Sequence, residues 1–187
     1  SDRLMQVYED ASAIGFPRGD VAVGNYAEWK KQQTVFEDMA AVTTRSFRLT
    51  GDGEPERVLA HAVTDSFLPT LGVQPMLGRN FLAEEDRPGA RKAAIISHNL
   101  WQRRYGSQAS IVGKDIFIDE AKYTVIGVMP PGFQFMVNTV DLYLPVAQQA
   151  APHVRVPAVP GEGHASGRLM VKKTRHGPAP SVAAICS

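Results

Sequence analysis

The sequence has a single cysteine, Cys186, next to the last of its 187 residues. One thiol forms no internal disulfide, so cysteine usage does not place the chain in an oxidising or a reducing compartment. Long apolar runs are also missing: the run from Ala93 to Ile96 is far shorter than the roughly 20 residues that a spanning helix needs. No secretion signal is recognisable either. These absences predict a cytosolic protein or a fragment of a longer one.

Charge of one sign is scarce as well. The 20 basic and 19 acidic residues are interleaved and leave a formal net charge of +1, so no broad field attracts phosphate backbones or anionic lipid. We therefore expect no nucleic acid partner. Hydrophobic residues make up 44% and charged residues 21% of the chain, which is ordinary globular usage and predicts a folded core, as one unit or two small subdomains.

Capping patterns predict the first helices. Asn25 with Glu28 forms a capping box, which predicts a helix that stops near Gln32. Thr34 with Glu37 repeats the pattern and predicts a second short helix directly after it.

Alternating apolar residues predict two hairpins and further strands. The first hairpin joins 46–50 to 57–63 through a glycine-rich turn, and the second joins 116–118 to 123–128. Further strands are expected at 92–96, 141–146 and 169–172. Short helices are expected between a cap at Asp65 or Ser66 and Gly72, and between Ser97 and Gly106.

Several motifs follow one another in a fixed order between about Val21 and Val146. They are Asn25–Trp29, Phe36–Ala41, Leu49–Gly51, Gly53–Val58, Phe67–Val73, Pro75–Arg79 with Phe81, Glu84–Asp86, Ser97–Arg104, Ile111–Lys114 and Tyr123–Phe133. In this order they resemble one family, the MacB-like periplasmic core domain of ABC transporter permeases, especially the large acidobacterial permeases. At 175–178 the chain reads Arg-His-Gly-Pro, where the family has a Lys-Pro-Gly-Val turn.

The resemblance implies an α+β fold: mixed sheets with short helices, in which porter-like βαβ units carry an inserted α/β subdomain. Residues 1–146 would be the MacB-like periplasmic core domain, and 147–167 a loop or connection rich in Pro and Ala. Residues 168–187 would supply a closing strand and the start of a helix of the same domain.

The resemblance also implies a function. The chain would be a non-catalytic extracytoplasmic domain that couples ATP-driven motion to the export of drugs, peptides or lipoprotein-like substrates. It would lie in the periplasm, in a protein of the cell inner membrane. Its partners would be the permease's own transmembrane helices, a second permease protomer, an ABC ATPase domain or subunit, and a periplasmic adaptor protein. The alternative is a ligand-sensing domain of a permease-like membrane protein, because one fold serves both roles.

Candidate sites have simpler structural interpretations. Ser97 and His98 at a strand-to-helix junction resemble a nucleophile position, but the flanking glycines of a nucleophile elbow are missing, so a helix cap is favoured. The acidic run Glu84, Glu85 and Asp86 lacks calcium-loop spacing and is interpreted as a solvated loop.

The remaining motifs do not assemble a ligand site either. The five histidines are His61, His98, His153, His164 and His176, and no two of them have the spacing of metal ligands on one helix face. The glycines Gly161, Gly163 and Gly167 lack the lysine of a phosphate loop. The aromatic residues Trp29, Trp101, Phe36 and Phe67 are interpreted as core rather than as a ligand cleft. We therefore predict no catalytic, cofactor-binding or metal residues and no cofactor.

Overall fold

The computed structural model describes residues 4–7, 9–11, 16–19, 21–22, 30, 32, 36–51, 53–135, 140–148 and 166–173. The strands are β1 (Leu4–Val7), β2 (Glu9–Ala11), β3 (Phe16–Gly19), β4 (Val21–Ala22), β5 (Phe36–Thr50), β6 (Glu56–Val63), β7 (Leu77–Gly78), β8 (Ala93–Ile96), β9 (Asp115–Ile118), β10 (Ala121–Val128), β11 (Leu142–Pro145) and β12 (Ser166–Lys173). The helices are α2 (Phe67–Leu71) and α3 (His98–Tyr105), with 3-10 turns η2 (Ala109–Ile111) and η3 (Val146–Gln148). The fold is therefore α+β, as predicted.

Ten of the described strands form one mixed sheet, and β2 pairs with β3 in a second, two-stranded sheet. Six of the ten close a ring. β5 pairs with β6, β6 with β11, β11 with β8, β8 with β10 and β10 with β9, and β9 returns to β5 at Leu49 and Thr50. Because β8 is paired on both edges and covered on both faces, all four of its residues are buried, which explains its unbroken apolar run.

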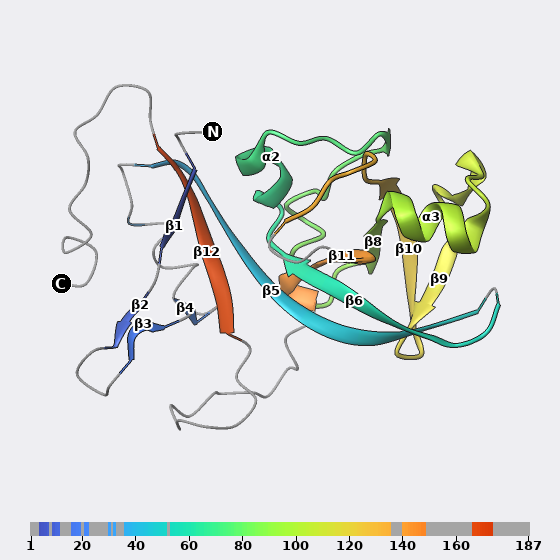
Figure 1. Cartoon of the computed structure of the whole chain (residues 1–187), viewed down its shortest axis with the longest axis horizontal. Helices are drawn as coiled ribbons and strands as arrows, with labels where there is room; N and C mark the ends of the chain where they lie inside the picture. Colours follow the sequence, from blue (N-terminus) through green and yellow to red (C-terminus); the bar gives the residue numbers. More distant parts are fainter. Residues whose placement is uncertain are drawn as a thin grey trace.

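A smaller part of the sheet lies at the other end of β5 (Figure 1). There β12 is antiparallel both to β1 and to the first half of β5, so β1 and β5 run parallel to each other, as the two strands of a βαβ unit do. β5 has 15 residues and passes from this terminal part into the ring without a break.

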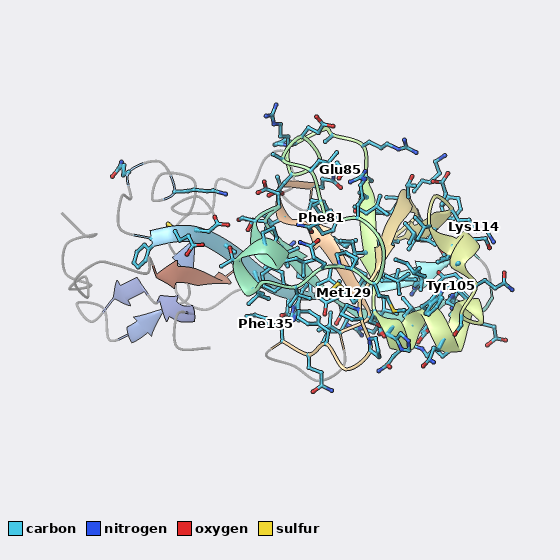
Figure 2. The ribbon with its side chains drawn as sticks, turned by 90° about the horizontal axis from the view of Figure 1, so that it is seen from above. Phe81, Glu85, Tyr105, Lys114, Met129 and Phe135 are labelled. Carbon is cyan, nitrogen blue, oxygen red and sulfur yellow. The ribbon has the colours of Figure 1, made fainter. Side chains whose placement is uncertain are left out.

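Two core clusters lie on opposite faces of the strands. Alternation sends Ala94 and Ile96 into one and Ala93 and Ile95 into the other. The first cluster takes residues from all six ring strands and from α3, whereas the second lies toward α2 and the loops. Figure 2 shows Phe81, Met129 and Phe135 of the second cluster toward the α2 end, with Tyr105 and Lys114 at the opposite end.

Two glycines let β7 approach β10. Gly78 pairs with Gly127, and a Cβ atom on Gly78 would lie 2.1 Å from the carbonyl oxygen of Ile126. A Cβ atom on Gly127 would lie 2.8 Å from the carbonyl oxygen of Arg79. Gly78 also has a φ of +76°, so glycine is required there for two independent reasons.

Most of the predicted elements are confirmed. Both hairpins form, as β5–β6 and β9–β10, and β8, β11 and β12 match the three further strands. The C-terminal caps are as predicted, because Gly72 and Gly106 end α2 and α3 in the left-handed conformation, and the Ser97 side chain caps α3. At the start of α2, Ser66 stands at the cap position, but its side chain makes no capping hydrogen bond. Of the helix predicted from Asn25, only Lys30 and Gln32 are among the described residues, and both are helical.

The second predicted helix, after Thr34, is wrong, because Phe36 begins β5. The residues after Phe36 pair with β12 on one side, and beyond Val42 the strand pairs with β6 on the other. Met39 to Thr43 are buried. Pairing and burial of this kind outweigh the local helical signal of Glu37 to Ala41.

Candidate functional site

The candidate site is the place where β5 changes partners. At Val42 the strand is paired both with Arg168 of β12 and with Val63 of β6. The backbone of β5 thus passes directly from the terminal part into the ring at this point. We call residues 39–44 of β5 together with residues 61–66 the β5 junction.

Where β6 ends, two side-chain hydroxyl groups take the place of its backbone as hydrogen-bond partners of β5. The Thr64 hydroxyl accepts a hydrogen bond from the Ala41 N–H at 3.1 Å, and the Thr64 N–H donates to the Ala41 carbonyl. The Ser66 hydroxyl then donates to the Met39 carbonyl at 2.7 Å. Because an unpaired buried amide costs about 1–3 kcal/mol, these two side chains let β5 continue while buried and without a strand on that edge.

His61 links the junction to the segment that contains Phe135. It is fully buried, and its imidazole bridges the Thr44 hydroxyl at Nδ1 (2.9 Å) and the Phe135 carbonyl at Nε2 (3.0 Å). Since a carbonyl only accepts, the proton is on Nε2, and Nδ1 accepts from Thr44. Burial lowers the pKa of His61, against a smaller opposite effect of the Phe135 carbonyl. The ring is therefore a neutral structural bridge.

The acidic run also makes structural contacts. Its interpretation as a solvated loop is wrong for Glu85 and Asp86. Glu84 is exposed, but Glu85 is buried and makes a two-pronged pair with Arg79, at 2.7 and 2.8 Å. Burial raises the pKa of Glu85, but the hydrogen bonds from Arg79 and the Leu82 N–H outweigh it and leave the pKa below its ordinary value.

Asp86 joins two distant segments. Its carboxylate accepts from the Asp65 N–H, at the start of α2, and from the Ala147 N–H, just after β11. Burial raises the pKa of Asp86 and outweighs the effect of these two bonds. Gln148 then donates to the carbonyl oxygens of Glu85 and Arg91. The acidic turn thus holds the chain as it leaves the ring, close to the junction.

α3 is fixed to the ring by a charge network. Arg103 pairs with Glu56 of β6 and with Asp141, which precedes β11. Arg104 donates to the Glu54 carbonyl at 2.9 Å and reaches Glu56 at 3.4 Å. Both arginines lie in the last turn of α3, where positive charge is favoured. These contacts link α3 to β6 and to the residue that precedes β11.

Ser97 and His98 both make structural contacts within α3. The Ser97 hydroxyl accepts from the Leu100 N–H at 3.1 Å, which is the predicted helix cap. The His98 ring lies against Trp101 with 5.6 Å between centroids.

Within the described part of the chain, no three His, Cys, Asp or Glu side chains are grouped as a metal site would need. The structure separates His61, in the junction, from His98, on α3. His153, His164, His176, Gly161 and Gly163 lie outside the described residues, and Gly167 is paired with Val21 in β12 and β4. Searching the same residues for a membrane span, we find no helix with the length and apolar character to cross a bilayer.

The aromatic prediction is confirmed where the structure describes it. Phe36, Phe67 and Trp101 are buried, although Phe36 lies on a strand and not on a helix. Trp29 lies outside the described residues.

Sequence reasoning missed the residues that hold the junction. Thr64 and Ser66 stand directly after an alternating strand and before a short helix, so hydroxyls at a strand end were the available signal. The signal for Glu85 was Arg79 six residues before it, but no local periodicity brings the two together. His61 carried no signal beyond its place in an apolar strand.

A family model described as the MacB-like periplasmic core domain matches residues 1–179. Among solved structures, the chain is similar to the periplasmic region of MacB from Actinobacillus actinomycetemcomitans, with a TM-score of 0.67 and 13% identity over 97% of this chain and 78% of that one. No curated protein matches the chain.

Two further structures are similar. The extracellular domain of the noncanonic ABC-type transporter YknZ from Gram-positive bacteria gives a TM-score of 0.60 and 17% identity over 91% of this chain and 82% of that one. A domain assigned to a permease protein from Porphyromonas gingivalis gives a TM-score of 0.67 and 16% identity over 95% of this chain and 77% of that one. At such low identities, these likenesses establish the fold alone.

Proposed function

Since this chain belongs to the family of MacB-like periplasmic core domains, the extracytoplasmic domains of ABC transporter permeases, we propose that it transmits ATP-driven motion rather than catalysing a reaction. Membership implies transmembrane helices and an ATPase as partners. The finer proposal is that the domain works in the periplasm of an inner-membrane exporter, opposite a second protomer and against an adaptor protein. It would help to export drugs, peptides or lipoprotein-like substrates. The proposal includes the division of the chain into a core domain at 1–146, a connection at 147–167 and a closing part of the same domain at 168–187.

The observation that carries the proposal is the continuity of β5. One strand is paired with β12 at its start and with β6 and β9 further on, so a displacement of the terminal part pulls directly on the ring. Backbone hydrogen bonds along a buried strand make a stiff connection, because a close-packed interior transmits strain. The hydroxyls of Thr64 and Ser66 keep that connection intact where β6 ends.

The test is a distance measurement in the complete permease with its ATPase. Cys186 is replaced by serine, and a spin label is placed at Gln102, which is exposed on α3. Electron paramagnetic resonance then measures the distance between the two labelled protomers without nucleotide and after vanadate trapping. In the permease with an unmodified junction, we expect this distance to change on vanadate trapping. The change should be smaller in Thr64→Val, because that variant leaves the Ala41 amide without its partner.

Thr70→Val is the matched control. The same chemical change removes a buried hydroxyl of α2 that has no hydrogen-bond partner in the described structure, so the nucleotide-dependent change in distance should persist. ATP hydrolysis is followed in parallel, because uncoupling leaves hydrolysis active. A distance that ignores nucleotide, or that responds equally in Thr64→Val, contradicts the proposal.

A further inference from the structure

The outer edge of β5 is open between two strands. On that edge the pairing with β12 ends at Val42 and Arg168, and the pairing with β9 begins at Leu49. In between, the Arg48 N–H donates to the Asp119 carboxylate, and the Arg48 carbonyl accepts from the Asp119 N–H. We call the backbone of Thr44 to Phe47 the β5 notch.

The direction of the free backbone groups follows from Arg48. Its N–H and carbonyl point away from β6, so those of Ser46 and Thr44, two and four residues earlier on the strand, point the same way. Thr44 and Ser46 are exposed, and within the described structure no hydrogen bond reaches these four groups. The gap from Val42 to Arg48 spans about 20 Å at ~3.3 Å per residue, which is room for a short strand.

On the opposite edge of β5, the backbone groups that lack a partner strand are satisfied by side chains. Where β6 ends, the hydroxyls of Thr64 and Ser66 satisfy the backbone of Ala41 and Met39. Among the described residues, no side chain satisfies the outward backbone groups of Thr44 and Ser46 in this way. Instead, a depression of about 470 Å³ lies beside the notch, lined by Ser46, Phe47, Arg48, Thr50, Arg57, Asp119 and Glu120.

The charges beside the notch indicate the chemistry of its occupant. Arg48 and Arg57 are directly opposite each other on β5 and β6, and a like-charged pair across two strands is destabilising when no anion lies between them. Both are exposed, and neither pairs with a carboxylate in the described residues. Asp119 is engaged by the Arg48 backbone, which leaves Glu120 as the other acidic side chain at the rim.

We propose that the β5 notch binds an extended segment of a partner protein by strand addition, with a carboxylate of that segment between Arg48 and Arg57. Main-chain hydrogen bonds to Thr44 and Ser46 supply the attraction, and the two arginines supply the selection. A second copy of this chain fits less well, because it would bring two arginine-bearing edges together. This inference does not depend on the proposed function.

The test uses the 187-residue chain and two fluorescent octapeptides of alternating valine and threonine, one with two glutamates and one with two lysines in their place. We expect the acidic peptide to bind at least about tenfold more tightly, because like charges at an interface oppose binding. Ser46→Pro removes an outward N–H that the β5–β6 ladder does not use, so the strand should persist while binding is lost. Ser46→Ala keeps the N–H and should bind normally.

A further variant and a modified peptide complete the test. Arg48→Glu combined with Arg57→Glu should reverse the preference between the two peptides. The acidic peptide N-methylated at alternate residues cannot donate and should not bind, which tests the same bonds without changing the protein. Equal binding of both peptides, binding that survives Ser46→Pro and N-methylation, or no binding at millimolar peptide overturns the proposal. A dimer of the chain that Ser46→Pro dissociates also overturns it, in favour of self-pairing.

Discussion

His61 is the residue at which pH should act on stability. Its imidazole is neutral and buried between Thr44 and the Phe135 carbonyl, and burial lowers its pKa from the ordinary value of 6.5. The unfolded chain therefore takes up a proton as pH falls below 6.5, whereas the folded chain resists it until lower pH. The stabilisation is complete above 6.5 and is lost as pH falls through the folded pKa.

We expect the free energy of unfolding to decrease between pH 7 and pH 5, with a slope of up to about 1.4 kcal/mol per pH unit from this residue. His61→Gln keeps an amide donor near the Phe135 carbonyl and should flatten the slope at the cost of some stability at pH 7. Urea unfolding at several pH values measures this. His98→Gln, the same change on α3, is the control, and an identical slope in all three proteins would contradict the prediction.

Glu120 should be replaceable with a gain in stability. Asp119 and Glu120 form the two-residue turn between β9 and β10 with φ angles of +45° and +66°. An L side chain is strained there, and Asp-Gly is a preferred sequence for this turn. Glu120→Gly should add about 0.5–1 kcal/mol to the free energy of unfolding. Glu120→Ala removes the same charge but keeps a Cβ atom, so it should give no such gain in urea unfolding.

Among the elements, the acidic turn should be worth more than its exposed position suggests. Glu85→Ala removes the partner of Arg79 and of the Leu82 N–H, and we expect a loss of about 1–3 kcal/mol. Glu84→Ala, one residue away and exposed, should change the free energy of unfolding by less than about 0.5 kcal/mol. Thermal unfolding followed by circular dichroism compares the two. Equal effects would show that the turn acts only through its charge.

The elements that could be predicted are those with a strong local pattern. The hairpin β9–β10, strand β8 and the caps of α3 follow from alternation and from Ser97 and Gly106. The first half of β5 could not be predicted, because its strand state depends on β12, more than 120 residues away along the chain. The site could not be predicted for the same reason: the residues that Asp86 and His61 contact, Ala147 and Phe135, are 61 and 74 positions away along the chain.

At the scale of the whole molecule, the ring and the terminal part depend on different portions of the chain. The ring uses β5 to β11, which form one continuous stretch, whereas the terminal part joins β1 to β12 across the ends. The ring is therefore an insertion in the chain between the strands of the terminal part. Under the proposed function, the terminal part would receive the movement and the ring would act on partners.

This arrangement predicts that the chain alone is monomeric in dilute solution. The exposed large hydrophobic side chains of the described part are Met76, Leu82 and Phe117, and isolated exposed apolar residues are ordinary on monomers. In a permease dimer, the membrane helices would hold two domains at a high effective concentration, so their mutual contacts can be weak. Sedimentation velocity at micromolar concentration should therefore show one species with the mass of a single chain.

Two copies of the domain that are held close together should contact each other. A chain fused to a dimeric coiled coil through a flexible linker mimics the membrane helices, and spin labels at Gln102, in a Cys186→Ser background, should then report a defined distance between the two domains. A broad distribution of distances in the fusion would mean that the domains do not face each other. A tight dimer of the unfused chain would mean that the domain itself, and not the membrane part, drives assembly of the permease.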